Sequence, residues 1–324
     1  MEMRAIITGG AGYVGSALVS RLTKEDCSLL SVDNLRRGDY RFLERYREDT
    51  QIKLIVGDIR ERTRLEENLR DFRDVDVIFH LAALPGLKLC EDNPEEAIEV
   101  NVLGTFNVLE VARRLDISRV VFASSAAVFG VPLKLPVDED HPTRPVNLYG
   151  VTKLAGERLM SLYHDNYGLE TVVLRFGNIY GVGLYTRWGT VIPRFVRLGL
   201  EGKPLTIYGD GGSSRDFVHV WDIIDALRLS AEADAGKVGG ETFNVGGETM
   251  RIGDLAEVVI EEVKGAAGRD IGVVHLPQRV GETRELSYST AKIEGRLGFS
   301  PRWTIRSGVR QLIEYYLKQG SDPH

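Results

Sequence analysis

The sequence predicts an α/β protein, with a Rossmann-type doubly wound parallel sheet and a smaller mixed α/β region. Three observations lead to this fold class. Short apolar runs alternate with longer amphipathic ones in the first half, a glycine-rich turn follows the first run, and glycine and proline become frequent after Arg175. Alternating strands and helices are what a parallel sheet with crossover helices requires.

The strands of this sheet are expected where the short apolar runs occur. Six runs fit, at residues 4–8, 28–33, 52–56, 75–80, 119–124 and 171–175. The carboxyl ends of parallel strands meet at one edge of a sheet, and ligands bind there in folds of this class. Side chains at the ends of these runs are therefore the first candidates for a functional site.

The helices are expected between and after these strands. In the first half the pattern predicts helices at residues 13–22, 94–115 and 149–167. The second of these begins at Asn93-Pro94 and carries Glu95 and Glu96 in its first turn, which suits the helix dipole. In the second half, apolar periodicity predicts helices near residues 191–200, 221–231, 252–264 and 305–318.

The higher frequency of glycine and proline after Arg175 divides the chain into two regions. We expect residues 1–174 to form a dinucleotide-binding domain and residues 175–324 to form a substrate-binding domain. Segments near residues 215–245 are expected to pack back onto the first domain. No repeat or low-complexity linker separates the two regions, so a cleft between tightly packed halves is predicted.

Composition narrows the class of protein. The 324 residues are 43% hydrophobic and 27% charged, and the net charge of -6 gives no electrostatic reason to bind nucleic acid or an anionic membrane. Only Cys27 and Cys90 occur, without metal-ligand spacing, so neither a metal site nor a disulfide framework is predicted. A strand-like run at residues 5–7 leaves no room for a signal peptide, and no apolar run reaches membrane-spanning length. We therefore expect a cytoplasmic protein.

The glycine-rich turn is the firmest functional signal. It places Gly9, Gly12 and Gly15 at intervals of three, between the first strand and a helix that begins at Tyr13-Val14. Such glycines permit a tight turn and let the backbone approach a pyrophosphate, which the helix N-terminus then faces. An ordinary glycine turn is the alternative, but strand, turn and helix follow in the order that dinucleotide binding requires.

Residues at the ends of the strands extend the cofactor site. Asp33 ends the second strand, where a carboxylate would accept a hydrogen bond from a ribose and repel a 2′-phosphate. This favours NAD over NADP, although Arg36 and Arg37 follow closely. His80 is interpreted as a packed strand-end residue. Further residues expected to contact NAD lie at the strand ends or on the segments that follow: Asn34, Asp58, Ile59, Leu81, Ala82, Ala83, Asn101 and Ser124.

A reacting centre is predicted from a serine, a tyrosine and a lysine. Tyr149 and Lys153 stand four residues apart, hence on one face of a helix, and a nearby cation favours the phenolate. Ser125 follows the fifth strand at the same edge of the sheet as the cofactor loops. Its hydroxyl can polarise a substrate oxygen while Tyr149 exchanges the proton. A tyrosine and lysine at this spacing are common on amphipathic helices, so the prediction depends on their combination with the serine and the glycine turn.

With these motifs the chain resembles the extended short-chain dehydrogenase/reductases, in the NAD-dependent nucleotide-sugar epimerase/dehydratase family. The resemblance covers nearly the whole length and rests on the segments TGGAGYVGS, HLAA, NVLGT, SSAAVFG, YGVTK, RFGNIYG and YGDGGSSRDFVHV. It implies NAD as cofactor and a nucleotide sugar as substrate. It implies Tyr149 as the base, Ser125 as the hydroxyl anchor, and Lys153 as the group that clamps the cofactor and tunes the pKa of the tyrosine.

The resemblance also implies a substrate site and a homodimer. Asn178, Arg215 and Arg279 would bind the nucleotide diphosphate. The other substrate contacts would come from Ser125, Tyr149, Thr190, Val191, Thr206, Tyr208 and Glu282. The dimer would form through the helices at about 97–115 and 149–166, where the apolar candidates, which could equally be core, are Val100, Leu103, Val108 and Leu109.

The residues after Ser125 distinguish among the reactions of the family. Dehydratases and decarboxylases resemble one another in carrying acidic residues there, whereas this chain has Ala126 and Ala127. Alanine cannot transfer protons, so the sequence predicts a 4-epimerase, closest in motif to UDP-glucose (galactose) 4-epimerases. Leu286 stands at the position that resembles their sugar-pocket gate, and predicts that N-acetylhexosamines also fit.

Two other functions stay open. One is a nucleotide-sugar reductase, dehydrogenase or dehydratase of the same family. The other is a non-catalytic NAD-binding regulator, which the presence of Ser125, Tyr149 and Lys153 disfavours.

Overall fold

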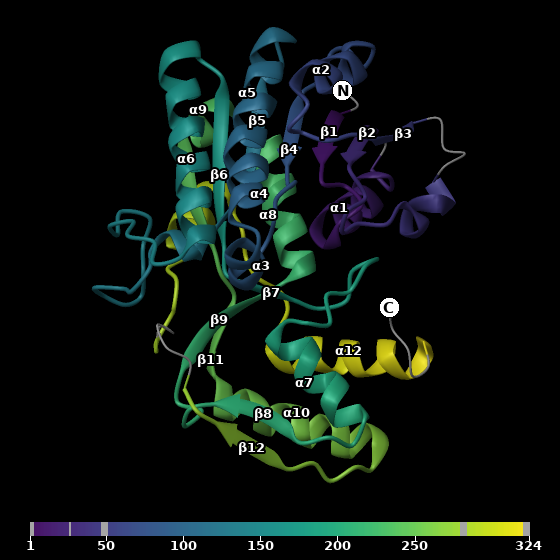
Figure 1. Ribbon diagram of the computed structural model, residues 1–324, viewed down its shortest axis with the longest axis vertical. Coiled ribbons are helices and arrows are strands. Elements are labelled where there is room, and N and C mark those ends of the chain that lie inside the picture. The colour runs from purple at the N-terminus through teal and green to yellow at the C-terminus, as the bar shows by residue number, and fades with distance from the viewer. Residues whose placement is uncertain (1–2, 26, 47–50, 279–283, 320–324) are drawn as a thin grey trace.

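The computed structural model describes residues 3–25, 27–46, 51–278 and 284–319. At its centre lies a parallel sheet of seven strands in the order β10-β6-β5-β4-β1-β2-β3 (Figure 1). This confirms the predicted Rossmann-type α/β class. The strands are β1 (Arg4–Thr8), β2 (Ser28–Asp33), β3 (Ile52–Val56), β4 (Val77–His80), β5 (Arg119–Ser125), β6 (Glu170–Phe176) and β10 (Glu241–Val245).

The order of the strands sets the position of a ligand crevice. The chain leaves β1 for β2 and β3 on one side, then returns to place β4 on the other side of β1. Loops that follow β1 and β4 therefore diverge and leave a crevice at the carboxyl edge of the sheet, where doubly wound proteins bind their ligands.

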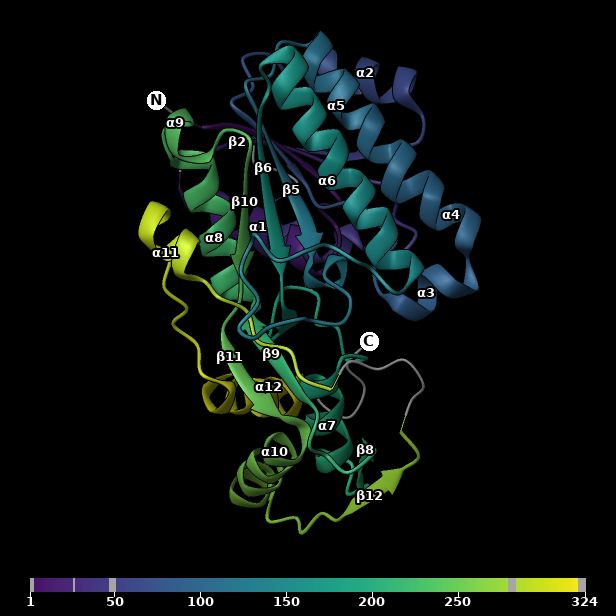
Figure 2. The ribbon, with the colours of Figure 1, turned by 90° about the vertical axis from the view of Figure 1, so that its left-hand side faces the viewer.

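Two layers of helices cover the two faces of the sheet. Within β1, the side chains alternate between the layers, because Ala5 and Ile7 belong to one hydrophobic core and Ile6 to the other. One face is covered by α2 (Arg62–Arg70), α5 (Gly104–Arg114) and α6 (Leu148–Tyr167), and the opposite face by α1 (Tyr13–Leu22), α8 (Val220–Glu232), α9 (Ala235–Val238) and α11 (Ala291–Leu297) (Figure 2).

The helix predicted at residues 94–115 is interrupted by a wider turn. It consists of α4 (Pro94–Ile98), a π-helical turn at Glu99–Leu103 and α5. At this turn the amide of Asn101 accepts a hydrogen bond from the Leu84 nitrogen (2.8 Å) and donates one to the Leu84 oxygen (3.2 Å). The local widening fits a residue that is held from outside the helix, a feature that periodicity cannot reveal.

A third hydrophobic core holds the smaller part of the molecule. This smaller part contains the three-stranded sheet β11-β9-β7 and the two-stranded sheet β12-β8. Its strands are β7 (Asn178–Tyr180), β8 (Leu205–Tyr208), β9 (Ser214–His219), β11 (Glu248–Arg251) and β12 (Val273–Leu276), and its helices α7 (Val191–Leu200), α10 (Ile252–Ala267) and α12 (Ile305–Gln319). The proposed boundary at residues 174 and 175 falls within β6, and β10 and α8 belong to the larger part.

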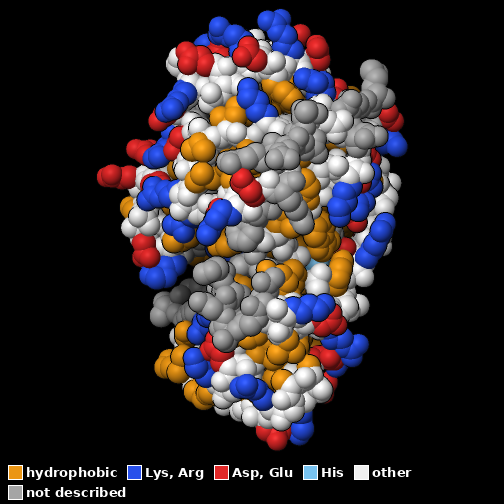
Figure 3. Space-filling model, turned by 90° about the vertical axis from the view of Figure 1, so that its right-hand side faces the viewer, with side chains coloured by type: hydrophobic (Ala, Val, Ile, Leu, Met, Phe, Trp, Pro, Cys, Tyr) orange, Lys and Arg blue, Asp and Glu red, His pale blue; other side chains and the backbone are white. Residues whose placement is uncertain are grey.

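Shorter helical segments complete the fold. They are the 3-10 helix at Tyr40–Tyr46, α3 (Leu87–Asp92) and the 3-10 turn at Ala126–Val128 that follows β5. In the part of the chain that the structure describes, no helix is both long enough and apolar enough to cross a membrane. Figure 3 shows acidic and basic side chains interspersed over the face that it presents, with hydrophobic side chains gathered between the upper and lower parts.

Candidate active site

A cavity of about 760 Å³ opens at the carboxyl edge of the main sheet and extends to the smaller part of the molecule. Most of the predicted site residues line it. On the side of the main sheet these are Gly9, Gly12, Tyr13, Val14, Gly15, Asp33, Asn34, Asp58, Ile59, Leu81, Ala82, Ala83, Ser124, Ser125, Tyr149 and Lys153. On the opposite side they are Asn178, Thr190, Val191, Thr206, Tyr208 and Arg215.

Among the predicted residues that the structure describes, Asn101 does not belong to this lining. Asn101 is buried, and its side chain bonds to the backbone of Leu84 and to the hydroxyl of Thr152 (3.0 Å). It therefore supports the loop after β4, which lines the cavity through Ala82, Ala83 and Leu84. Arg279 and Glu282 lie outside the described residues, and their roles stay predictions.

The glycine turn brings two segments of backbone into close contact. Gly9 has a φ of +75°, and a Cβ there would lie 2.7 Å from the Ala82 nitrogen. At Gly15 a Cβ would lie 2.1 Å from the Gly9 oxygen. No side chain caps the start of α1, so its first N–H groups stay available for an anion. This arrangement fits the pyrophosphate of a dinucleotide.

The ends of β2 and β3 place two carboxylates at one end of the cavity. Asp33 accepts hydrogen bonds from the Ala11 nitrogen (3.1 Å) and the Leu35 nitrogen (2.8 Å), while burial raises its pKa. Asp58 is likewise partly buried, but hydrogen bonds from Arg60 and Asn34 outweigh that effect and hold its pKa at about 2. Asp33 is thereby fixed where it could accept hydrogen bonds from a ribose.

Arg36 forms an ion pair across the rim of this end of the cavity. Its guanidinium contacts the carboxylate of Glu96, which comes from α4, and both residues line the cavity. The arginine is thus engaged with an acidic side chain.

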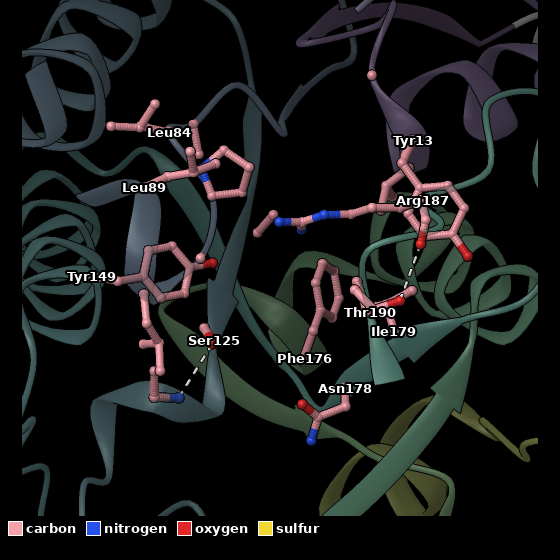
Figure 4. Close-up of a pocket in the computed structure, with 18 of the residues that line it drawn as sticks. Tyr13, Leu84, Leu89, Ser125, Tyr149, Phe176, Asn178, Ile179, Arg187 and Thr190 are labelled. Carbon is pink, nitrogen blue, oxygen red and sulfur yellow. Dashed lines mark hydrogen bonds between the residues drawn. The ribbon is translucent and has the colours of Figure 1, made fainter. Parts of the chain in front are cut away.

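Ser125 and Tyr149 lie together at the other end of the carboxyl edge (Figure 4), and Lys153 lines the same cavity. Tyr149 and Lys153 follow one another on successive turns of α6, which begins after the Asn147 side chain caps the Gly150 nitrogen (2.8 Å). The Ser125 hydroxyl is near enough to the Tyr149 phenol to lower the pKa of that phenol. The ammonium of Lys153 donates to the Ala123 oxygen (2.8 Å) and lies 6.0 Å from the centre of the Tyr149 ring.

Burial dominates the ionisation of these groups. It raises the pKa of Tyr149 to about 12, against the opposing effects of Arg187 and the Ser125 hydroxyl. It lowers the pKa of Lys153 to about 8, against the opposing effects of Cys90 and Glu157. At pH 7 the lysine is still mostly charged, whereas the phenol needs added positive charge to act as a base.

His80 is a packed residue of the sheet, as interpreted from the sequence. It is buried, and its two ring nitrogens contact the hydroxyls of Thr8 (2.8 Å) and Thr105 (2.9 Å). Burial lowers its pKa to about 3, so the ring is neutral at pH 7.

The residues on the opposite wall of the cavity lie on or next to β7, α7, β8 and β9. The Asn178 amide donates to the Asp216 oxygen (3.0 Å), and Thr190 stands directly before α7. Asp216 is buried and accepts from the Gly247 nitrogen (2.9 Å) and the Thr249 hydroxyl (3.3 Å). Its neighbour Arg215 lines the cavity, where a guanidinium can contact phosphate.

Arg187 is a cavity residue that the sequence reasoning missed. Its side chain reaches across the cavity from the wall that carries Thr190 toward the wall that carries Tyr149 (Figure 4). Within the described part of the chain, its guanidinium has neither a hydrogen bond nor an ion pair. A Cβ on Gly86 would lie 3.3 Å from its Nη2 atom. No motif marks this arginine, because its position depends on the course of an irregular segment.

Comparison with known proteins gives consistent matches over the whole chain. The sequence model of the NAD-dependent epimerase/dehydratase family matches residues 5–246. The UDP-glucose 4-epimerase of Mycolicibacterium smegmatis is 31% identical over 320 residues, which cover 97% of this chain and 98% of that protein.

Solved structures agree with these matches. A UDP-glucose 4-epimerase from Thermotoga maritima, solved with UDP-glucose, is 27% identical and superposes with a TM-score of 0.89, over 98% of this chain and 99% of that one. A UDP-glucuronic acid 4-epimerase from Bacillus cereus, solved with UDP-glucuronic acid and NAD, is 30% identical with a TM-score of 0.86 and the same coverage.

Proposed function

Because the chain belongs to the NAD-dependent epimerase/dehydratase family, we propose that it catalyses the reversible 4-epimerisation of UDP-glucose and UDP-galactose, and of their N-acetyl forms. Its cofactor is NAD, and its activity is of the nucleotide-sugar epimerase/dehydratase class. The observation that carries the finer proposal is the wall of the cavity at Ser125, where Tyr149 and Lys153 are near and only Ala126 and Ala127 follow the serine.

The cofactor has a fitting place at the glycine turn. The uncapped start of α1 would face the pyrophosphate, and the carboxylate of Asp33 would accept from the adenosine ribose. Lys153 would hold the nicotinamide ribose. When bound, NAD supplies a hydride acceptor that can return the hydride to the same carbon.

The chain itself would manage the proton and the oxygen of the sugar. The Tyr149 phenolate takes the proton of the 4-hydroxyl as the hydrogen on C4 leaves as hydride, which gives a 4-keto sugar. Ser125 holds the oxygen by a hydrogen bond throughout. After the ketone has turned in the cavity, Tyr149 would give the proton back to the oxygen as C4 is reduced again on its other face. No net oxidation results.

The alanines after Ser125 support this outcome over dehydration. Elimination of water needs a further acid and base near the sugar, and Ala126 and Ala127 supply neither. The return of the hydride to C4 is then the reaction of the 4-keto sugar that these residues favour.

The test is product analysis with UDP-glucose as substrate. We expect UDP-galactose to form, with no net change in NADH absorbance. Accumulation of NADH would identify a dehydrogenase instead, and a 4-keto-6-deoxy sugar product would identify a dehydratase. The Tyr149→Phe variant, measured in parallel, controls for a contaminating epimerase.

Arg187 favours a second candidate substrate, a nucleotide-linked hexuronic acid. An unpaired guanidinium in a cavity close to Tyr149 suits a carboxylate on the sugar, because an arginine–carboxylate pair can form two parallel hydrogen bonds. The relative from Bacillus cereus acts on UDP-glucuronic acid, which makes this sugar the natural probe.

Substitution of Arg187 separates the two candidates. If the substrate is a uronic acid, Arg187→Leu should lower kcat/KM for UDP-glucuronic acid about 100-fold more than for UDP-glucose, since loss of a charged hydrogen-bond partner costs on the order of 3 kcal/mol. If Arg187→Leu instead lowers kcat/KM by an equally small factor for both sugars, and UDP-glucose is the better substrate of the unaltered protein, the substrate is the neutral hexose.

The gate residue Leu286 concerns the N-acetyl sugars. It lines the cavity, and its nitrogen bonds to the Ser214 hydroxyl (3.4 Å), which fixes its backbone. A leucine leaves more room than an aromatic residue, so UDP-N-acetylglucosamine should be turned over. Leu286→Tyr should suppress that activity while retaining UDP-glucose epimerisation, and exclusion of the larger sugar by the unaltered protein would contradict the proposal.

We also propose a homodimer through α5 and α6. Of the apolar candidates on α5 and on the π-helical turn before it, Val100, Val108 and Leu109 are buried within the subunit, whereas Leu103 is 46% exposed. Leu162 on α6 is also exposed, at 47%. An interface there would cover both leucines.

A further inference from the structure

We propose that a buried triad, Ser124, Glu157 and Arg175, is a positioning device that holds the end of β5 in register with α6, so that Ser125 and Tyr149 meet in working geometry. The inference rests on the proposed function, because it concerns the geometry of the same reacting groups. It assigns a task to three residues, two of which, Glu157 and Arg175, have no part in the proton transfer described above.

Consecutive residues at the end of β5 are tied to residues spaced by four on α6. The Ser125 hydroxyl lies near enough to the Tyr149 phenol to lower its pKa, and the Ala123 oxygen accepts from the Lys153 ammonium at 2.8 Å. Residues four apart lie on one face of a helix. The two outer contacts therefore align one strand end with one helix face, but each involves a group that must also serve the reaction.

The middle contact involves two side chains that have no part in the proton transfer described above. The Ser124 hydroxyl donates to the Glu157 Oε1 atom at 2.6 Å, and both side chains are buried. Glu157 follows Lys153 by four residues, so it continues the same helix face. This short bond to a carboxylate is of the strong, charge-assisted kind.

Arg175 fixes the carboxylate from the neighbouring strand. Its Nε atom donates to Oε1 of Glu157 at 2.9 Å and its Nη2 atom to Oε2 at 2.7 Å, which makes the pair bidentate. In the sheet, Arg175 on β6 stands directly beside Ser124 on β5 and Asn244 on β10. The triad thus links α6 to a row of residues that crosses three strands.

Stability alone gives a weak reason for such a buried ion pair. Glu157 and Arg175 are only 6% and 8% exposed in their side chains, and the cost of removing both charges from water offsets much of their attraction. Apolar residues of similar size would serve packing as well. What an ion pair with fixed geometry adds is direction, since the carboxylate can stand only where the planar guanidinium and the Ser124 hydroxyl both reach it.

Two variants test the role, because one of them could be too unstable to study. Glu157→Gln keeps the shape and removes the charge, and Ser124→Ala removes only the hydroxyl and leaves the ion pair. Small misplacement of reacting groups costs on the order of tenfold to 100-fold in rate. We expect kcat to fall by that amount for Glu157→Gln, with KM for the nucleotide sugar and NAD content unchanged, and by several-fold for Ser124→Ala.

A matched control exists on the same two strands. Arg119 on β5 and Glu170 on β6 form an ion pair at 2.6 Å, at the opposite edge of the sheet from the cavity. Glu170→Gln should lower the melting temperature and leave kcat unchanged.

Amide hydrogen exchange gives a readout that does not depend on turnover. Exchange in the peptide covering residues 123–129 should rise in Glu157→Gln and Ser124→Ala, and stay unchanged in Glu170→Gln. The positioning role is overturned if the two triad variants behave like the control, or if the loss of activity in Glu157→Gln lies in KM or in NAD content. Absence of epimerisation by the unaltered protein would instead refute the proposed function.

Discussion

Among single residues, Tyr149 is the one that takes and returns the proton in the reaction that we propose. Tyr149→Phe removes one oxygen and keeps the ring in its half-buried place. General acid–base catalysis contributes about 10²- to 10⁴-fold, so kcat for epimerisation should fall by at least about 100-fold. NAD content and melting temperature should stay near those of the unaltered protein. Retention of full activity would show that another group is the base.

Lys153 should make stability depend on pH. Its pKa is about 8 in the folded protein, below the ordinary value of 10.5, because burial disfavours the charge. Between these two pH values the unfolded chain binds more protons at this residue, so the lysine's contribution to folding stability rises with pH and is lost again as pH falls toward 8. The difference amounts to about 3 kcal/mol.

Denaturant titrations of the cofactor-free protein at pH 7 and pH 10 would measure this effect. Other groups also titrate in that range, so the informative quantity is the difference from Lys153→Met. The variant should be the more stable protein at pH 7, with the gap closing by pH 10. A gap that does not change with pH would contradict the assigned pKa shift.

A residue of the site could be predicted from the sequence where it belongs to a motif of neighbouring residues along the chain. Gly9, Asp33, Ser125 and Tyr149 each stand at a strand end or on a helix that the sequence pattern already indicates, and each lines the cavity. Arg187 could not be predicted, because only the folded course of residues 181–190 brings its guanidinium to the tyrosine.

Among the helices and strands, the predicted bounds agree best with the observed ones where an element has buried apolar residues. The bounds of β1, β2, β3, α1 and α7 match the predicted ranges, since each carries a clear apolar pattern. β4 starts at Val77 rather than at residue 75, because Asp74 takes a φ of +55° and the chain is still turning there. Strands such as β7 and β12 were missed, because they are three or four residues long and lie among glycine-rich segments.

The packing of α1 against the glycine turn gives a prediction at this scale. Gly15→Ala would place a Cβ 2.1 Å from the Gly9 oxygen, which is backbone and cannot step aside cheaply. We expect a loss of about 1–3 kcal/mol in folding stability, as for other overpacked sites, together with weaker NAD binding. Thermal unfolding and the NAD content of the purified protein would report both effects.

A matched substitution separates this steric effect from a general effect of alanine. Gly265 lies in α10 and would bring its Cβ near no other atom within 4 Å. Gly265→Ala should therefore stabilise the protein, by up to about 1 kcal/mol. Equal behaviour of the two variants would show that crowding at Gly15 is unimportant.

At the scale of the whole molecule, the proposed dimer can be tested on its exposed leucines. Leu103→Glu combined with Leu162→Glu would place two charges in the interface, and burial of unpaired charge is costly. Sedimentation should then show a monomer. Leu317 on α12 is 53% exposed but lies away from α5 and α6, so Leu317→Glu is the control and should leave the dimer intact. A dimer that survives the double substitution would place the interface elsewhere.

The seventh strand of the sheet has a consequence for how this molecule can be divided. β10 joins the edge of β6 only after the chain has built β7, β8 and β9 on the far side of the cavity. A fragment that ends near residue 174 would therefore leave the edge of β6 unpaired and the side of α1 that packs against α8 uncovered. Exchange of one half for that of a relative, by recombination in nature or in the laboratory, would need several crossover points, because α8 to β10 and later α11 each return to the larger part.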